Sequence, residues 1–318
     1  MSASKLVSVV TPCLNQGQFL EETLASVAKQ GYRPIQQIVI DGGSTDDTLE
    51  VLRTWSQRAH GADYSFEWVS EPDRGHADAL NKGFDRARGE MVGWLNSDDV
   101  YFDINAIQRA VSALAAHPDV DLIFGDVALI SESSGLQMIW CFPEFKYERA
   151  LRGYLFSQPT AFFRKSLIDR HRLEPTLKLA PDTALWLTMG REAKFLHVGA
   201  IQAGDRDHGG RLTNANRTAL QQTHEQLVRA CGAPMRVSSL TKFYDRLTKA
   251  YMRGRGLVYL GRLAQDKELP RKLAFPMWTD SFGSAARRQL MMRLGSRTNM
   301  GPHPARKEAL KSARTAAD

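Results

Sequence analysis

The stretch Met91-Val92-Gly93-Trp94-Leu95-Asn96-Ser97-Asp98-Asp99 joins a short apolar run to a turn with two adjacent carboxylates. The run from 91 to 95 is typical of a strand buried on both faces. Adjacent carboxylates on a turn can hold a hard divalent cation, because Mg²⁺ and Mn²⁺ prefer oxygen ligands and commonly take only one or two from the protein. Taken alone, aspartates in a turn are more often caps of the following helix, so the surrounding sequence has to decide.

The same succession of apolar run, polar turn and helical spacing occurs three times before this stretch. Strands are predicted at 6–10, 37–40 and 65–69, and helices at 19–29, 48–59 and 77–87. Alternating strands and helices with apolar strands predict an α/β fold with a mostly parallel sheet and helices on both sides.

Polar residues follow each predicted strand at its carboxyl end. They are Thr11, Asp41, Asp73 and the pair Asp98 and Asp99. Ligands of open parallel sheets bind beyond the carboxyl ends of the strands. We therefore expect these residues to meet at one binding crevice.

The remainder of the chain is less regular. A hairpin is predicted from 127–130 and 137–140 around Ser134-Gly135, with helices near 147–153, 165–170 and 182–191. From residue 232 the composition becomes basic and is punctuated by glycines, with 18 Lys and Arg against 6 Asp and Glu. We predict a catalytic domain over 1–231, with halves of about 1–100 and 101–231, and a basic, mainly helical extension over 232–318 that is disordered after about Pro302.

Composition narrows the class of protein further. The 318 residues are 43% hydrophobic with a net charge of +7, and Cys13, Cys141 and Cys231 lack metal-ligand spacing. No long apolar run and no secretory signal is present, so we expect a cytoplasmic protein. The stretch from Asp41 to Thr48 matches neither the P-loop nor the dinucleotide-binding fingerprint, which disfavours kinases, ATPases and dehydrogenases.

Four motifs in order carry a family resemblance. They are Val9-Val10-Thr11-Pro12-Cys13-Leu14-Asn15, Ile40 to Thr48, Glu71-Pro72-Asp73-Arg74-Gly75 with Asn81-Lys82-Gly83, and Leu95 to Asp99. Over roughly residues 5 to 215 the chain resembles the family-two inverting glycosyltransferases with the GT-A fold, such as those of bacterial polysaccharide assembly. The resemblance implies a nucleotide-diphosphate sugar donor, a Mn²⁺ or Mg²⁺ cofactor and inversion at the transferred sugar.

The resemblance also assigns residues to the donor site. Asp98 and Asp99 match the acidic metal motif, with Asp99 as the expected direct ligand, and His208 in Arg206-Asp207-His208-Gly209-Gly210 matches a late segment that contacts metal or diphosphate. Many relatives have a second acid where this chain has Gly42, which leaves the donor base open. The residues expected to bind the nucleotide sugar are Thr11, Pro12, Asn15, Asp41, Gly43, Ser44, Asp73, Arg74, Gly75, Asn81 and Asp98.

Asp182 is the expected general base. It matches a family segment in which an acid opens a helix with a Leu-Trp-Leu stretch, here Leu185-Trp186-Leu187. An inverting transfer needs a base at the acceptor hydroxyl, and a carboxylate is the usual choice. The alternative role for Asp182 is a favourable charge at a helix N-terminus. Gln158-Pro159-Thr160 resembles an acceptor-side loop.

The basic extension leaves two interpretations open. Its aromatic and apolar residues between arginines are typical of segments on anionic membranes, which would place the enzyme on the inner face of the plasma membrane with a glycan or lipid-linked acceptor. The alternative is ordinary helices packed on the catalytic domain. No nucleic-acid-binding module is recognisable. A silent sugar-nucleotide-binding scaffold and a nucleotidyltransferase are the rival functions.

Overall fold

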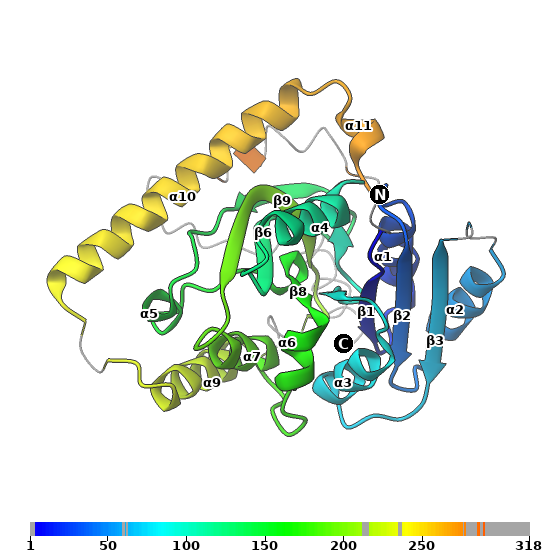
Figure 1. The fold of residues 1–318 in the computed structure, drawn as a ribbon. Coiled ribbons are helices and arrows are strands. Elements are labelled where there is room, and N and C mark those ends of the chain that lie inside the picture. Colours follow the sequence, from blue (N-terminus) through cyan, green and yellow to red (C-terminus); the bar gives the residue numbers. More distant parts are fainter. Residues whose placement is uncertain are drawn as a thin grey trace, which may run out of the picture.

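A single sheet forms the centre of the molecule, with helices packed around it (Figure 1). The computed structural model describes residues 4–58, 61, 63–211, 216–234, 237–275, 277, 285, 286 and 289. Within these residues the sheet has nine strands in the order β3-β2-β1-β4-β8-β6-β9-β5, and β7 pairs with β6. The predicted α/β class is confirmed.

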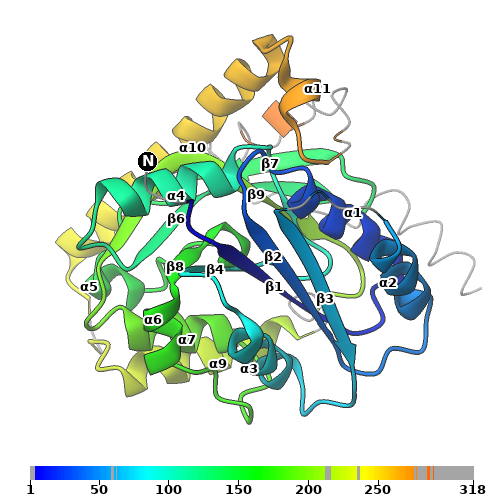
Figure 2. The same ribbon diagram turned by 45° about the vertical axis from the view of Figure 1, so that its right-hand side comes forward.

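The N-terminal half contains the predicted parallel strands. They are β1 (Val7–Cys13), β2 (Ile35–Asp41), β3 (Tyr64–Ser70) and β4 (Met91–Trp94). The intervening helices are α1 (Gly17–Ala28), α2 (Thr48–Ser56) and α3 (His76–Arg86). Helices α1 and α2 cover Val39 on one face of the sheet, and α3 covers Ile38 and Ile40 on the other (Figure 2). The alternation of side chains along β2 accounts for this burial on both faces.

The second half of the sheet is mixed. It contains β5 (Val100–Tyr101), β6 (Leu122–Ser131), β7 (Leu136–Trp140), β8 (Phe162–Arg164) and β9 (Phe195–Asp207). Strands β6 and β7 form the predicted hairpin, and β6 runs parallel to β9. The 13-residue strand β9 was not predicted from the sequence. Its buried polar residues Gln202, Asp205 and Arg206 interrupt the apolar pattern that identifies a buried strand.

Four further helices follow the sheet strands of this half. They are α4 (Ala106–Ala116), α5 (Tyr147–Ala150), α6 (Lys165–Arg170) and α7 (Pro181–Met189). The predicted helices near 147–153, 165–170 and 182–191 are therefore present.

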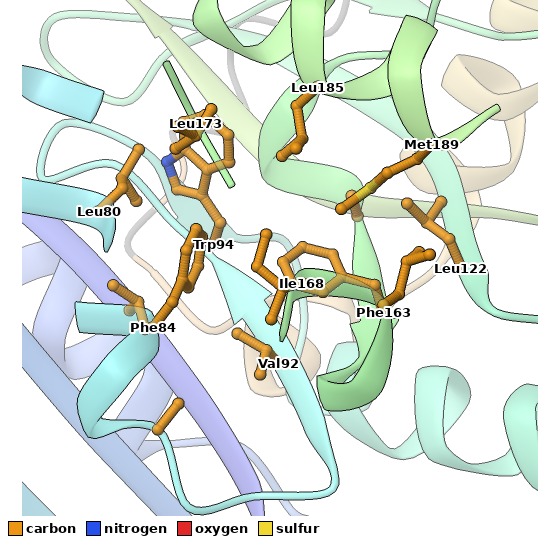
Figure 3. Close-up of a cluster of buried hydrophobic side chains, with 14 of the residues drawn as sticks. Leu80, Phe84, Val92, Trp94, Leu122, Phe163, Ile168, Leu173, Leu185 and Met189 are labelled. Carbon is orange, nitrogen blue, oxygen red and sulfur yellow. The ribbon is translucent and has the colours of Figure 1, made fainter. Parts of the chain in front are cut away.

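Trp94 packs helices α3 and α7 against the end of β4. Its ring packs among Leu80 and Phe84 of α3, Leu173, and Leu185 of α7 (Figure 3). This cluster brings the start of α7, which carries Asp182, toward the turn after β4.

The C-terminal helices are α9 (Arg217–Ala230), α10 (Ser239–Gln265) and α11 (Leu269–Lys272). Leu260, Leu269 and Phe275 share a core cluster with Val100 and Ile139 of the sheet, so the described residues on both sides of position 232 pack together. The expected disorder after Pro302 concerns residues outside the described part of the chain. None of the described helices combines the length and apolar character needed to cross a bilayer.

Candidate functional site

A cavity of about 940 Å³ opens at the carboxyl ends of β1 and β4. Its walls come from the turns after β1, β3 and β4, from the loop 156–159, from residues 175–183 before and within α7, from the end of β9, and from α9. Six of the residues predicted from the sequence line it, namely Pro12, Asp73, Gly75, Asp98, Asp99 and Asp182. The crevice expected beyond the strand ends is therefore present.

The turn after β2 supports the cavity from behind instead of lining it. The buried Asp41 carboxylate accepts hydrogen bonds from the backbone N–H groups of Gly43 (3.1 Å) and Ser44 (3.0 Å), and from the Ser70 hydroxyl (2.6 Å). The Ser44 hydroxyl accepts from the backbone N–H of Asn15 at 2.7 Å. Asp41, Ser44 and Asn15 therefore fix the two loops to each other, and Thr11 beside them is fully buried in β1.

Gly42 and Asp73 occupy adjoining positions. A Cβ atom built on Gly42 would lie 2.6 Å from Oδ2 of Asp73, closer than real Cβ contacts come. A side chain at position 42 and the present Asp73 carboxylate therefore exclude each other. Asp73 also accepts from the backbone N–H of Gly75 at 2.7 Å, and Gly75 has a φ of +119° that favours glycine.

The side chains of two predicted donor-site residues form contacts with other protein groups and do not reach the cavity. The Arg74 guanidinium is exposed and pairs with Asp78 at 2.7 Å. The Asn81 amide donates to the carbonyl of Leu173 (2.8 Å) and accepts from its N–H (3.2 Å), which ties α3 to the loop before α7. Neither side chain lines the cavity.

The turn after β4 holds the most acidic part of the site. Asp98 Oδ2 lies 2.9 Å from Nε2 of His208, and Asp205 at the end of β9 lies 2.6 Å from the Arg211 guanidinium and accepts from Ser157 at 3.0 Å. Asp99 is 3% exposed and accepts from the backbone N–H of Arg206 at 3.0 Å and from the Asn96 amide at 3.2 Å. Asp98 is the more accessible carboxylate, with 19% of its side chain exposed.

Burial and the crowding of these carboxylates shift their pKa values. Burial, with the charges of Asp98 and Asp205 added to it, raises the pKa of Asp99 well above its usual range. Burial also raises the pKa of Asp205, although Arg211 opposes the shift. Burial alone would raise the pKa of Asp98, but the hydrogen bond from His208 and the charge of Arg211 outweigh it and lower the pKa.

Arg206 holds the acidic turn in place. Its guanidinium is fully buried, donates to the Asp98 carbonyl at 2.8 Å and to Ser134 Oγ at 2.8 Å, and pairs with Glu22 at 3.1 Å. Its charge is therefore directed at Glu22 and at backbone on the far side of the turn. Arg211 remains as the cation facing the carboxylates inside the described part of the cavity.

A hydrogen-bond network between Trp94 and Asn96 fixes the orientation of His76. The Trp94 indole can only donate, and it donates to Oδ1 of Asn96 at 2.8 Å. The amide of Gln158, in the 3₁₀ turn Gln158–Thr160, donates to the Trp94 carbonyl at 2.5 Å, so its Oε1 accepts from the Asn96 amide at 2.9 Å. Because Oδ1 of Asn96 is an acceptor, Nε2 of His76 at 3.2 Å must carry a proton. Burial lowers the pKa of His76. In the neutral ring Nδ1 is then an acceptor.

Asp182 lies in the first turn of α7, directly after Pro181 and the left-handed Ala180. It lines the cavity and is half-buried, and burial raises its pKa above the usual value, with the backbone N–H of Thr183 and the charge of His76 opposing the shift. A carboxylate with a raised pKa accepts a proton more readily than an exposed one, provided that it is ionised.

His76, Asp205, Arg211 and His224 are among the titratable lining residues that were not assigned a role from the sequence. Arg211 follows directly after the Gly-rich segment Arg206–Gly210, so its position was the available signal. No local sequence pattern identifies Asp205, His76 and His224, which lie on β9, α3 and α9 and reach the cavity only in the folded chain.

The donor set fits a divalent cation in charge and chemistry. The buried carboxylates Asp99 and Asp205 and the partly exposed Asp98 face one guanidinium, which leaves an excess of negative charge that a cation would offset. The described residues contain no group of three or more His, Cys, Asp or Glu side chains arranged to hold a metal ion by themselves. A cation held by one or two protein ligands and completed by phosphate oxygens is consistent with both observations.

Comparisons with known proteins identify the family of the chain. The profile described as Glycosyl transferase family 2 matches residues 8–171. A PGL/p-HBAD biosynthesis glycosyltransferase of Mycobacterium tuberculosis H37Ra is 30% identical over 129 residues, 41% of this chain and 49% of that protein. The chain thus spans about half the length of this relative. An uncharacterised glycosyltransferase of Rickettsia prowazekii is 26% identical over 238 residues, 70% of this chain and 69% of that protein.

Two solved structures share the fold at low sequence identity. TarS 1–349 of S. aureus in complex with UDP-GlcNAc has a TM-score of 0.56 and 16% identity over 94% of each chain. The mannosyltransferase PcManGT of Pyrobaculum calidifontis, in complex with GDP-Man and Mn²⁺, has a TM-score of 0.50 and 17% identity over 100% of this chain and 82% of its own. With the family profile covering more than half of its residues, the chain belongs to glycosyl transferase family 2 and has the GT-A fold.

Proposed function

We propose that the chain is a metal-dependent inverting glycosyltransferase that moves a sugar from a nucleotide-diphosphate donor to a hydroxyl of a glycan or lipid-linked acceptor. One observation carries the proposal. A single cavity contains the acidic array of Asp98, Asp99 and Asp205 together with a separate carboxylate, Asp182, on α7. The array suits a cation and a diphosphate, and Asp182 suits proton removal from an acceptor.

The nucleotide part of the donor is assigned to the turns after β1 and β3. Pro12, Asp73 and Gly75 line the cavity there, and Asn15, Asp41, Gly43 and Ser44 hold the neighbouring loops behind them. We assign Asp73 as the carboxylate that contacts the nucleoside, because it fills the space of a side chain at position 42. The donors present in the TarS and PcManGT structures support a nucleotide sugar as the ligand class.

Asp98 and His208 are our proposed protein ligands for Mn²⁺ or Mg²⁺. Asp98 is preferred over Asp99 because Asp99 is more deeply buried and already accepts two hydrogen bonds. A bound cation would offset the charge that develops on the departing diphosphate. Arg211 supplies further positive charge at the same wall of the cavity. Asp99 then stabilises the turn that carries Asp98, because it accepts hydrogen bonds from the Arg206 backbone and the Asn96 amide.

Asp182 is the proposed general base. The acceptor hydroxyl oxygen forms a bond to C1 of the donor sugar as the bond from C1 to the diphosphate oxygen breaks, and the hydroxyl proton passes to an Asp182 oxygen. Attack from the face opposite the diphosphate inverts the anomeric centre. The raised pKa of Asp182 supports this role, since it makes the carboxylate a stronger base.

The acceptor and pathway are proposed by analogy with relatives. The named activity of the mycobacterial relative, in PGL/p-HBAD biosynthesis, supports a lipid-linked or glycan acceptor made for the cell surface. A cytoplasmic enzyme working at the inner face of the plasma membrane fits such an acceptor.

Two rival functions make different predictions. A silent scaffold would not need Asp182 beside the acidic array, and a nucleotidyltransferase would form the sugar nucleotide from a nucleoside triphosphate. The stretch from Pro12 to Gly17, which such an enzyme would use as a basic phosphate loop, has no Lys or Arg.

The test is nucleotide release from UDP-, GDP- and TDP-sugars in the presence of Mn²⁺, Mg²⁺ or EDTA, with and without lipid-linked acceptors. We expect slow hydrolysis of one donor that requires the cation, is lost in Asp98→Asn, and is stimulated by acceptor only when Asp182 is intact. Asp119→Asn, an exposed carboxylate paired with Lys194, is the control. Donor binding without turnover under any condition would overturn the proposal in favour of the scaffold.

A further inference from the structure

Helix α10 exposes an unusual number of large apolar side chains. Eight such side chains are exposed among the described residues, and six belong to this helix. Their exposed fractions range from 49% for Leu247 to 66% for Tyr251, and the six are Leu240, Phe243, Tyr244, Leu247, Tyr251 and Val258. A contiguous apolar surface of this kind indicates a partner, because single exposed apolar residues are normal and clusters are not.

The six side chains form one stripe along the helix. Positions 240, 244, 247, 251 and 258 recur at intervals of three, four and seven residues, which places them on one face of an α-helix. Met252, Gly256 and Leu260 lie on the opposite face and pack on the sheet. We call the exposed face, made of the six residues named above, the α10 stripe. Figure 1 shows α10 on the outside of the molecule.

Buried and partly buried contacts hold α10 on the domain. Arg255 reaches the fully buried Asp126 at 3.1 Å, and Asp245 accepts from Arg152 at 3.1 and 3.2 Å. A side chain at Gly256 would lie 2.8 Å from the carbonyl oxygen of Ile139, so the helix approaches β7 closely. The α10 stripe is therefore presented on a helix whose other face is occupied.

The charges of α10 are nearly all positive. The helix has six basic residues and one acid, Asp245, which is used in the pair with Arg152. Lys242, Arg246 and Arg262 form no ion pair with a described residue. From residue 232 onward the chain has 18 Lys and Arg against 6 Asp and Glu.

The positive charge of α10 indicates which kind of partner binds the α10 stripe. A second copy of the chain docking stripe to stripe would bring cations together, with no free carboxylate on either helix to pair with them. An anionic lipid surface complements the cations, and its boundary between headgroups and acyl chains accommodates Phe, Tyr and Leu. Long basic side chains beside the stripe can reach lipid phosphates while their stems stay on the apolar side.

We propose that the α10 stripe and the adjoining Arg246 and Arg262, which follow Phe243 by three residues and Val258 by four, dock the protein on an anionic membrane surface. Helix α9, which lines the cavity with Leu220, Gln221 and His224, is separated from α10 by only eight residues in the sequence. If the proposed function holds, docking therefore anchors the cavity wall that α9 forms to the membrane that carries a lipid-linked acceptor. Membrane binding itself does not depend on that function.

The test is co-sedimentation of the full chain with vesicles of phosphatidylcholine alone or with about one third phosphatidylglycerol, at two salt concentrations. We expect binding to the anionic vesicles, weak binding to the neutral ones, and weaker binding at high salt. Leu247→Ser with Tyr251→Ser, and separately Arg246→Glu with Arg262→Glu, should each lower the affinity about tenfold or more. The matched control is Lys29→Glu with Arg53→Glu, two exposed cations, one directly after α1 and one on α2, that should leave binding unchanged.

Three results would overturn the proposal. Equal binding of wild type to anionic and neutral vesicles, or equal loss in the control variant, would show that the stripe is not a lipid surface. Self-association of wild type in solution that the stripe variants abolish would assign the face to a second copy. Hydrolysis of a soluble donor should be the same in wild type and stripe variants, which separates failure of this inference from failure of the proposed function.

Discussion

Nε2 of His208 lies 2.9 Å from Oδ2 of Asp98, although the two residues are 110 positions apart in the chain. The contact joins the segment after β9 to the turn after β4, where the partly exposed Asp98 carboxylate lies beside a histidine nitrogen. It makes the two side chains testable as a pair of cation ligands.

Replacing His208 should weaken the binding of the cation and leave the fold intact. We expect His208→Ala to raise the Mn²⁺ concentration for half-maximal donor hydrolysis by about tenfold or more, because one ligand of the pair is lost. The measurement is nucleotide release over a Mn²⁺ titration. His171→Ala, which removes a histidine paired with Glu192 outside the cavity, should not move the midpoint. An unchanged midpoint in His208→Ala would remove His208 from the metal site.

Replacing Arg211 should change the affinity for the cation and the affinity for the diphosphate in opposite directions. Its guanidinium lies 2.6 Å from Asp205 and is attracted to Asp98 and Asp99 as well, so it competes with a cation for the same negative charge. In Arg211→Gln we expect tighter Mn²⁺ binding and about tenfold weaker binding of UDP or GDP, measured by calorimetry. A merely structural role would weaken both, and that result would contradict the assignment.

Asp182 should lower the stability of the folded protein at neutral pH. Its folded pKa is raised by burial, so between the unfolded pKa and the folded pKa the native state binds more protons than the unfolded state. Stability from this group is therefore present at low pH and lost as pH rises through the folded pKa. Asp182→Asn should melt at a higher temperature than wild type at pH 7.5, with a difference that shrinks toward pH 4.

Asp182→Asn should also lower acceptor-dependent turnover by about a hundredfold or more, because the carboxylate that accepts the proton is removed. Asp169→Asn, an exposed carboxylate on α6 paired with Lys165, should change neither quantity. A variant that is less stable than wild type at pH 7.5 would show that Asp182 is a structural cap.

His76 should be replaceable by an amide but not by a hydrocarbon ring. Glutamine can donate to Oδ1 of Asn96 and still present an acceptor to the cavity, whereas phenylalanine can do neither. We expect donor hydrolysis within about threefold of wild type in His76→Gln and a loss of about tenfold or more in His76→Phe. Melting curves of both variants check that the fold is kept. Equal activity in the two variants would exclude a hydrogen-bonding role.

Much of the fold could be predicted because its signals are local. The parallel strands from β1 to β4 were expected within two or three residues at each end, since apolar runs and polar turns follow one another there without interruption. Strand β9 could not be predicted in the same way. It buries Gln202, Asp205 and Arg206, whose partners come from α4, the loop 156–159 and the turn after β4.

The sequence by itself determined the family, the succession of strand, turn and helix, and the carboxylates Asp98, Asp99 and Asp182 as candidates. These follow from neighbouring residues, because strand and turn preferences act over a few positions. Only the tertiary structure decided that Asp41 is a buried support for its loop, that Asp205 and Arg211 join the acidic wall, and that Asp98 is more accessible than Asp99. Burial and pairing depend on residues about a hundred positions away, and no local pattern encodes such contacts.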